Sequence, residues 1–283
     1  MIPVEFEYAA PDSLEEAIDA LVQGGEDAKL LAGGHSLLPL MKLRLAAPTM
    51  LVDLRRVPGL RGVERADGTL RIGAMTRHAD LEDEPELGLI SHAAGLIADR
   101  QVRHRGTIGG SLAHGDPASD LPAVLLACEG SVGVEGSDGT REIPAAELFQ
   151  DYLTTAVGEG EVMTEVRLPA LTDYGFGYRK FTRRAEDWAM VGVCALVKAD
   201  NGTCEDARVG LTHMSSVPLR ATAVEEALRG SALDADSIAR AAEAAAEGTG
   251  PPGDLNATPE YKRHLARVLT RRALEEAAGL TAA

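Results

Sequence analysis

The sequence predicts an α+β fold in two domains. The length of 283 residues suggests two domains, although one or three would also fit. Before Pro169, short strand-like runs alternate with helical segments, whereas two long apolar strands and then three helical segments follow it. We therefore expect an N-terminal domain over residues 1–173 and a smaller C-terminal α+β domain over residues 174–283, with an antiparallel sheet and helices.

The first segment predicts a small α/β unit. Ser13 and Glu16 fit a capping box, and apolar residues recur at helical spacing over residues 14–22. Short buried strands are expected at residues 29–32 and 50–54.

From about residue 60 the pattern changes. We expect a strand at 69–74, a helix over 86–102, and a loop over the Gly-, Pro-, Ser- and Asp-rich residues 106–122. A short helix at 121–128 and a hairpin turning at residues 137–139 follow.

The C-terminal part predicts a hairpin and three helices. The Asp-Asn-Gly sequence at 200–202 favours a tight turn between strands at 190–198 and 207–213. A Pro-rich break at 249–256 separates the last two of three helical segments, which lie near 219–229, 234–247 and 259–277.

Composition and charge narrow the class of protein. Hydrophobic and charged contents of 45% and 25% are ordinary for a soluble globular protein. A formal net charge of −16 argues against nucleic-acid binding, and it means that local groups must hold any anionic ligand. The sequence shows neither an apolar run of membrane-spanning length nor a secretory signal, so we expect a cytoplasmic protein, or one held peripherally at the inner membrane through a complex.

The three cysteines are Cys128, Cys194 and Cys204, and they form no C-x-x-C pair. We therefore expect neither an iron–sulfur cluster nor a structural zinc in this chain, and interpret them as reduced, partly buried residues.

Two segments pair glycines with a serine just after an apolar stretch: AGGHSL at 32–37 and TIGGSL at 107–112. Glycine permits positive φ and lets N–H groups converge into an anion-binding nest, to which a hydroxyl adds a donor. Either loop alone could simply be a tight turn, but together they favour a site for the two phosphates of a dinucleotide. Neither loop matches a Rossmann fingerprint or a P-loop.

Longer blocks around these loops carry a family resemblance. AGGHSLLPLMKLRL at 32–45 and DRQVRHRGTIGGSLAHGDPASDLP at 99–122 closely resemble the FAD-binding signatures of the medium subunits of molybdenum hydroxylases. GAMTRHADLE at 73–82 and KFTRRAEDWAMV at 180–191 resemble further blocks, and the similarity spans essentially the whole chain.

The resemblance implies a fold and its divisions. The N-terminal part resembles an FAD-binding domain of the vanillyl-alcohol-oxidase/xanthine-dehydrogenase (PCMH) type, with subdomains at about 1–55 and 56–173. Residues 174–283 resemble the C-terminal domain of carbon monoxide dehydrogenase flavoproteins.

The resemblance also implies that both loops line the FAD pyrophosphate and adjoining ribityl. The cofactor-binding residues expected from these blocks are Ala32, Gly33, Gly34, His35, Ser36, Leu37, Thr107, Ile108, Gly109, Gly110, Ser111, Ala113 and Asp116.

Five further residues fall at family positions near the cofactor: Ile97, Asp120, Met163, Lys180 and Trp188. Asp120 could instead cap the helix that follows it. Lys180 could be a solvated lysine, and Trp188 could be ordinary core packing.

The remaining polar residues predict no catalysis. His35 and His114 lie in the cofactor loops, where we expect no proton transfer, and no metal site is expected. Four arginines, at positions 103, 105, 183 and 184, could hold FAD phosphates, face a partner subunit or be solvated.

The function implied by the resemblance is that of an electron-relaying oxidoreductase subunit. FAD in this chain would take electrons from [2Fe–2S] clusters of a small partner and pass them to quinone, NAD or oxygen, while a large partner carries molybdopterin. The family suggests that the complex is a dimer of heterotrimers, which is a heterohexamer. Within the family, the chain best resembles the medium subunit of aerobic carbon monoxide dehydrogenase.

Two alternatives stay open at this point. A stand-alone FAD-dependent oxidase would need an acid or base facing the flavin, for which the sequence offers no persuasive residue. A scaffolding subunit that has lost its flavin would not need both glycine loops, which are intact.

Overall fold

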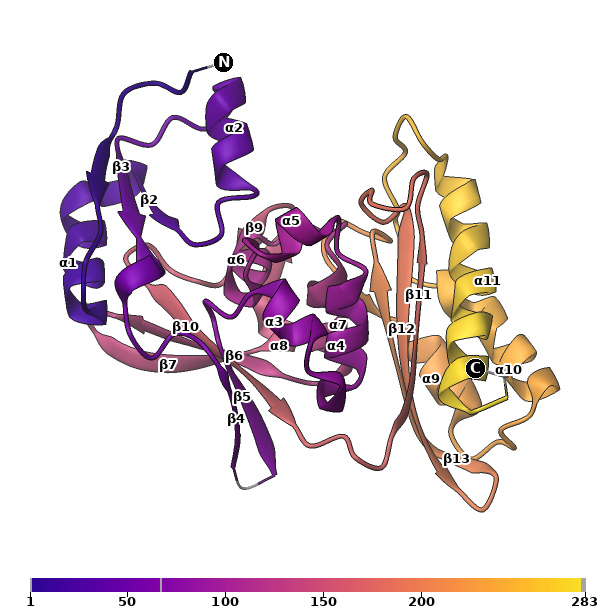
Figure 1. The fold of residues 1–283 in the computed structure, drawn as a ribbon. Helices are drawn as coiled ribbons and strands as arrows, with labels where there is room; N and C mark the ends of the chain where they lie inside the picture. Colours follow the sequence, from indigo (N-terminus) through magenta and orange to yellow (C-terminus); the bar gives the residue numbers. More distant parts are fainter. Residues whose placement is uncertain (1, 67, 281–283) are drawn as a thin grey trace.

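The computed structural model of the chain describes residues 2–66 and 68–280, which form three sheets, a two-stranded ribbon and the helices packed on them (Figure 1). One sheet is parallel and the others are antiparallel, which confirms the predicted α+β class. Within the described ranges, no helix has both the length and the apolar character that crossing a membrane requires.

The N-terminal unit is a parallel sheet of three strands in the order β1-β3-β2, seen in indigo in Figure 1. Its first helix forms as predicted, because the Ser13 hydroxyl accepts the N–H of Glu16 at 3.1 Å and the Glu16 carboxylate accepts the N–H of Asp12 at 2.9 Å. The elements of this unit are β1 (Glu7–Ala9), α1 (Leu14–Gly24), β2 (Ala28–Leu31), α2 (Leu37–Leu43) and β3 (Met50–Asp53).

The second unit is an antiparallel sheet in the order β4-β5-β10-β6-β7, with short helices packed on it in the middle of Figure 1. β10 joins the predicted β6–β7 hairpin and the β4–β5 hairpin into one sheet by pairing with both β5 and β6. The elements are β4 (Val63–Ala66), β5 (Thr69–Gly73), α3 (His78–Glu82), α4 (Leu89–Gly95), α5 (Arg100–Arg103), α6 (Ile108–His114), α7 (Asp120–Ala127), β6 (Ser131–Gly136), β7 (Gly139–Pro144), α8 (Ala145–Leu148), β8 (Phe149–Asp151), β9 (Thr154–Thr155) and β10 (Val162–Pro169).

The C-terminal unit is an antiparallel meander backed by helices, as predicted. Asn201 and Gly202 both have positive φ, of 49° and 78°, which is the geometry that a two-residue hairpin turn requires. The elements are β11 (Gly175–Phe181), β12 (Val191–Asp200), β13 (Thr203–Thr212), β14 (Leu219–Arg220), α9 (Thr222–Leu228), α10 (Ala235–Ala242) and α11 (Pro259–Ala277).

Both faces of the C-terminal sheet are buried, which explains the unbroken apolar run of β12. Val193 and Ala195 belong to the core shared with α11, whereas Cys194 and Leu196 belong to the core of the second unit. Side chains alternate between the faces of a strand, so one strand contributes to both cores. The sheet therefore fixes the C-terminal unit against the helices of the middle unit.

The helix predicted over residues 86–102 is wrong in its continuity. The structure has α4 and α5 instead, separated at Ala98, whose φ is 43°. A left-handed residue ends a helix, and the Asp99 side chain then accepts the N–H of Val102 at 2.8 Å to begin the next one. The break brings Ile97 and Ala98 to a cavity.

The loop predicted over residues 106–122 is also wrong in part, because α6 and the first residues of α7 lie within it. Thr107 caps α6 by accepting the N–H of Gly110 at 3.2 Å. The glycines that suggested a loop instead allow this helix to pack closely against its neighbours.

Candidate functional site

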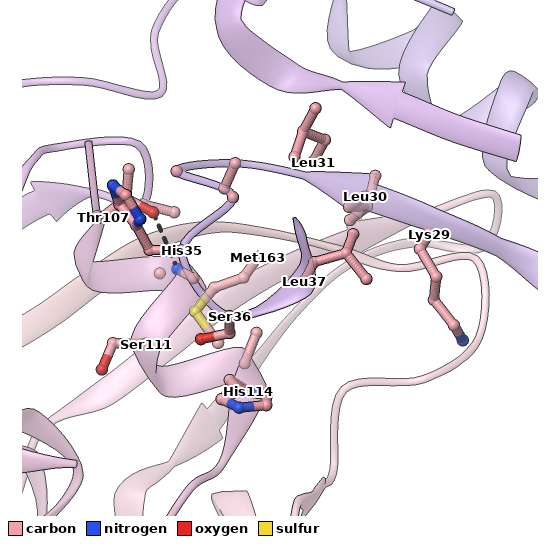
Figure 2. A pocket seen from close by; sticks show the side chains of 18 of the residues that line it. Lys29, Leu30, Leu31, His35, Ser36, Leu37, Thr107, Ser111, His114 and Met163 are labelled. Atoms are coloured by element: carbon pink, nitrogen blue, oxygen red, sulfur yellow. Dashed lines mark hydrogen bonds between the residues drawn. The ribbon is translucent and has the colours of Figure 1, made fainter. Parts of the chain in front are cut away.

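A cavity of about 650 Å³ lies where the first loop, α6, the start of β10 and the β11–β12 connection meet. Side chains from both glycine loops face this space in Figure 2, among them Ser36 and His35 of the first loop and Thr107 and Ser111 of the second. One cavity therefore collects the segments that the sequence singled out.

The first loop leaves β2 at Leu31 and turns through Gly33 and Gly34 into α2. A Cβ on Gly33 would lie 2.3 Å from the carbonyl oxygen of Arg105, and Gly34 has a φ of 79°. The first position requires glycine because of the close approach and the second because of its conformation. These two requirements explain the Gly-Gly pair.

This loop presents unpaired main-chain donors. The N–H groups of Gly33, Gly34, His35 and Ser36 have no acceptor within the part of the chain that the structure describes. Four successive free N–H groups beside a cavity form a nest that suits an anion such as a phosphate.

The second loop does not offer the free N–H groups that the sequence predicted for both loops. The N–H groups of Ile108 and Gly109 donate to the carbonyls of Thr76 and Ala74, at 3.0 and 2.9 Å. Those of Gly110 and Ser111 donate to Thr107, so all four are already satisfied. This loop offers hydroxyls and a close-packed surface to the cavity. Of these eight N–H groups, only the four of the first loop are free within the described chain.

The two loops are packed against each other. Besides the approach of Gly33 to Arg105, a Cβ on Gly110 would lie 3.6 Å from the Cβ of Ala32. The absence of side chains at these glycines therefore lets segments far apart in the sequence form one continuous wall.

A buried ion pair forms the floor of the cavity. The Lys180 ammonium donates to Asp120 at 2.9 Å and to the Leu96 carbonyl at 3.1 Å, and the two charged side chains are only 7% and 4% exposed. The Tyr178 hydroxyl also donates to Asp120. Burial raises the pKa of Asp120, while Lys180 and Tyr178 act against that rise.

These contacts test the alternative roles considered for Lys180, as a solvated lysine, and for Asp120, as a helix cap. Lys180 is buried, so it is not a solvated lysine. Asp120 is the first residue of α7, and its carboxylate accepts from Lys180 and Tyr178, whereas Ser119 is the N-cap residue.

The mouth of the cavity is lined by less polar groups. Ile97 lines it from the α4–α5 connection, Met163 from β10 and Trp188 from the β11–β12 connection. Trp188 is 58% exposed, which excludes the core-packing alternative. An exposed indole beside a cavity can cover a planar ligand.

Two family models together match almost the whole chain. Residues 4–171 match the family described as the FAD binding domain in molybdopterin dehydrogenase, and residues 176–277 match the CO dehydrogenase flavoprotein C-terminal domain. The chain belongs to the FAD-binding medium subunits of the carbon monoxide dehydrogenase and xanthine dehydrogenase family.

Full-length relatives support this membership. The chain is 43% identical to the carbon monoxide dehydrogenase medium chain of Hydrogenophaga pseudoflava, with 98% of each chain covered. It is 40% identical to the 6-hydroxypseudooxynicotine dehydrogenase complex subunit alpha of Paenarthrobacter nicotinovorans, with 98% of this chain and 96% of that one covered. A solved carbon monoxide dehydrogenase structure from Hydrogenophaga pseudoflava matches the full length of both chains with a TM-score of 0.96 and 45% identity.

The resemblance inferred from the sequence is thereby confirmed, as are the oxidoreductase class and the presence of an FAD-binding domain. The medium-subunit fold places most of the predicted cofactor residues around the cavity. These are Ala32, Gly33, Gly34, His35, Ser36, Leu37, Ile97, Thr107, Gly109, Gly110, Ser111, Ala113, Asp120, Met163, Lys180 and Trp188.

Two predicted residues do not line the cavity. Ile108 is 1% exposed and packs in the core of the second unit, so its side chain supports the loop from behind. Asp116 accepts the N–H of Ala118 at 2.8 Å and so shapes the turn before α7.

The arginines divide between two roles. Arg103 is buried, where it pairs with Glu82 at 2.7 Å and donates to the carbonyls of Ile97 and Ala98. It therefore holds the α4–α5 break in place. Arg183 and Arg184 are exposed on the β11–β12 connection.

Tyr178 and His78 are among the residues of the site that sequence reasoning missed. Tyr178 lies two positions before Lys180 in β11, so both face Asp120, and the period of two was the signal that could have revealed it. His78 lines the cavity at the start of α3 and is 5% exposed, with no hydrogen-bond partner for Nδ1 in the described chain. Nothing in the sequence distinguished it from a surface histidine.

We predict that Lys180→Met lowers the free energy of unfolding by about 3 kcal/mol, because it leaves the buried Asp120 carboxylate without its ammonium. Urea denaturation followed by circular dichroism measures the change. Lys198→Met is the control, since Lys198 pairs with Glu205 at 3.0 Å at the surface. Equal losses in the two variants would contradict the assignment of a buried pair.

His78 predicts a pH-dependent stability. Burial, with smaller contributions from Arg103 and His35, lowers the pKa of His78 from 6.5 to about 4. The unfolded chain takes up a proton below pH 6.5, while the folded chain does not do so until about pH 4. Stability is therefore lost as the pH falls from 6.5, and the loss levels off below pH 4.

We accordingly predict that His78→Leu reduces the fall in unfolding free energy between pH 7 and pH 5 by about 2 kcal/mol relative to the unmodified chain. Urea titrations of both proteins at the two pH values measure it. An unchanged difference would show that His78 titrates normally.

Proposed function

We propose that this medium subunit carries FAD and relays electrons within a molybdenum hydroxylase. Electrons would arrive from [2Fe–2S] clusters of a partner subunit and leave to a terminal acceptor such as quinone, NAD or oxygen. The nest of free N–H groups at Gly33–Ser36, beside a cavity large enough for an extended ligand, supports this proposal most directly.

The residues of the cavity suit the chemical parts of FAD. The N–H groups of Gly33–Ser36 would hold the pyrophosphate, and the hydroxyls of Thr107 and Ser111 would face it from the other loop. Bound FAD supplies the ability to accept and release electrons singly or in pairs, while the protein supplies position and electrostatics.

The floor and mouth would surround the flavin ring. Lys180 contributes a fixed positive charge, held by Asp120, at a position where it would favour added electron density on a bound ring. Trp188, Ile97 and Met163 would contact the ring through apolar surface and exclude water from it.

Partner subunits would carry the remaining cofactors. We propose a small [2Fe–2S] subunit and a large molybdopterin subunit, assembled as a dimer of heterotrimers in the cytoplasm. The relatives called medium chain or complex subunit support a multi-subunit assembly. Their names cover substrates from carbon monoxide to 6-hydroxypseudooxynicotine, and we favour carbon monoxide because the 43% relative carries that name.

We also propose a division of the chain into domains. We place the FAD-binding domain at 1–173, with subdomains of about 1–55 and 56–173, and the second domain at 174–283. Family matches that end at residue 171 and begin at residue 176 support this boundary.

We predict that Gly110→Val abolishes FAD binding while most of the fold remains. A side chain there would begin 2.8 Å from the Thr107 hydroxyl and displace the wall shared by the two loops. The ratio of flavin to protein, from visible absorbance of the purified subunit, measures the effect.

Gly250→Val is the matched control, because a Cβ at Gly250 would meet no atom within 4 Å. We expect this variant to keep its FAD. Normal flavin content in Gly110→Val would count against the role of the loops.

The relay is tested on the native complex. We expect the chain to copurify with two other subunits that contain iron and molybdenum, and its flavin to bleach on addition of the substrate of the complex only when the iron-containing subunit is present. A flavin-loaded chain that copurifies with no such subunits and oxidises a substrate alone would instead identify a stand-alone oxidase.

A further inference from the structure

The β11–β12 connection, residues 182–190, forms one side of the cavity mouth. It brings Glu186, Asp187 and Trp188 to the cavity, and its base is closed by the hydrogen bond from the N–H of Met190 to the Phe181 carbonyl at 2.9 Å. Trp188 is mostly exposed, so its own packing does not fix it. Contacts made by other residues of this connection must therefore determine the position of the Trp188 indole.

One such contact comes from His213, which follows β13. Its Nδ1 lies 2.8 Å from the carbonyl oxygen of Ala189, the residue next to Trp188. A carbonyl only accepts, so Nδ1 carries the proton and Nε2 is left as an acceptor. His213 is held in turn at a φ of 62°, with its N–H donating to the Pro117 carbonyl at 2.8 Å.

Lys262 of α11 supplies the donor for this acceptor. Its Nζ lies 3.3 Å from Nε2 of His213 and 2.7 Å from Oδ2 of Asp254, and its side chain is 0% exposed. An ammonium removed from water requires such partners, and here the His213 ring and the Asp254 carboxylate supply them.

Asp254 is itself fixed. It accepts the N–H groups of Asn256 and Ala257 at 2.7 and 2.9 Å. Burial acts to raise the pKa of Asp254, but the hydrogen bonds from Lys262 and these N–H groups outweigh it and hold that pKa at about 2. Asp254 thus remains a carboxylate that keeps the Lys262 ammonium in place.

Donors and acceptors therefore match along a continuous path from Asp254 through Lys262 and His213 to the Ala189 carbonyl. We propose that Lys262 and His213 are positioning residues that hold the β11–β12 connection, and with it Trp188, at the mouth of the cavity. The inference rests on the proposed function only for the identity of the ligand, FAD. The geometry of the path concerns this chain alone.

Trp188 is the only tryptophan of the chain, so intrinsic fluorescence reports on this connection directly. In flavin-free subunit, Lys262→Met and His213→Asp should lower the fluorescence anisotropy of Trp188 and increase its quenching by acrylamide. His213→Asn should restore both, because an amide can donate to the Ala189 carbonyl whereas a carboxylate of the same shape cannot. Asn and Asp both tolerate the left-handed backbone at this position.

Arg271→Met is the control on the same helix, since Arg271 is exposed and pairs with Glu275 at 2.8 Å. It should leave Trp188 unchanged. A connection that is seated only about one-tenth of the time would raise the Kd for FAD about tenfold in Lys262→Met and His213→Asp. Titration of flavin-free subunit with FAD measures that Kd.

Unchanged anisotropy and quenching in Lys262→Met and His213→Asp, with native circular dichroism, would overturn the proposal. If Lys262→Met does not fold, the comparison of His213→Asp with His213→Asn decides alone, because both keep Lys262 and Asp254. The fluorescence measurement needs no flavin. Failure of the unmodified chain to bind FAD would therefore contradict the proposed function without touching this inference.

Discussion

The contact between Gly33 and the Arg105 carbonyl is the constraint on which the site depends. A Cβ at Gly33 would sit 2.3 Å from that oxygen, so any other residue would separate the two loops. Their contact makes the first loop and α6 one wall of the cavity, to which the first loop contributes its free N–H groups. The parallel unit and the central antiparallel unit are thereby joined at the cavity. A replacement at Gly33 would act on both loops at once.

The contact between the two loops also affects the electrostatics of the cavity, because it places the free N–H groups there. A chain with a net charge of −16 repels an anionic dinucleotide as a whole. N–H dipoles and one buried ammonium act at short range, where the general field matters less. The burial of Lys180 against Asp120 ties β11 of the C-terminal sheet to α7 of the central unit, so the floor of the site lies at the junction of the two. Lys180 and Asp120 thus line the cavity and also join the two units.

The sequence predicted local structure well where local interactions decide it. The Ser13 cap, the Asn201–Gly202 turn and the helix at 259–277 depend on neighbouring residues, and they appear as expected. The sequence-based prediction was wrong where contacts with residues distant in the sequence determine the local structure. The helix predicted over 86–102 breaks at Ala98, whose position is stabilised by Arg103, and α6 forms in a glycine-rich stretch because carbonyls of Ala74 and Thr76 accept its first N–H groups. Most of the proposed cofactor residues that line the cavity could be named from the two signatures. Which N–H groups are free and which are satisfied depends on tertiary contacts, and no sequence pattern shows these.

A crystal structure of the chain grown with FAD tests the central claim most directly. Phosphate oxygens of the cofactor should lie within hydrogen-bonding distance of the N–H groups of Gly33, Gly34, His35 and Ser36, with the flavin ring between Lys180 and Trp188. Phosphates bound at another surface, or protein groups covering those N–H groups in the complex, would contradict it.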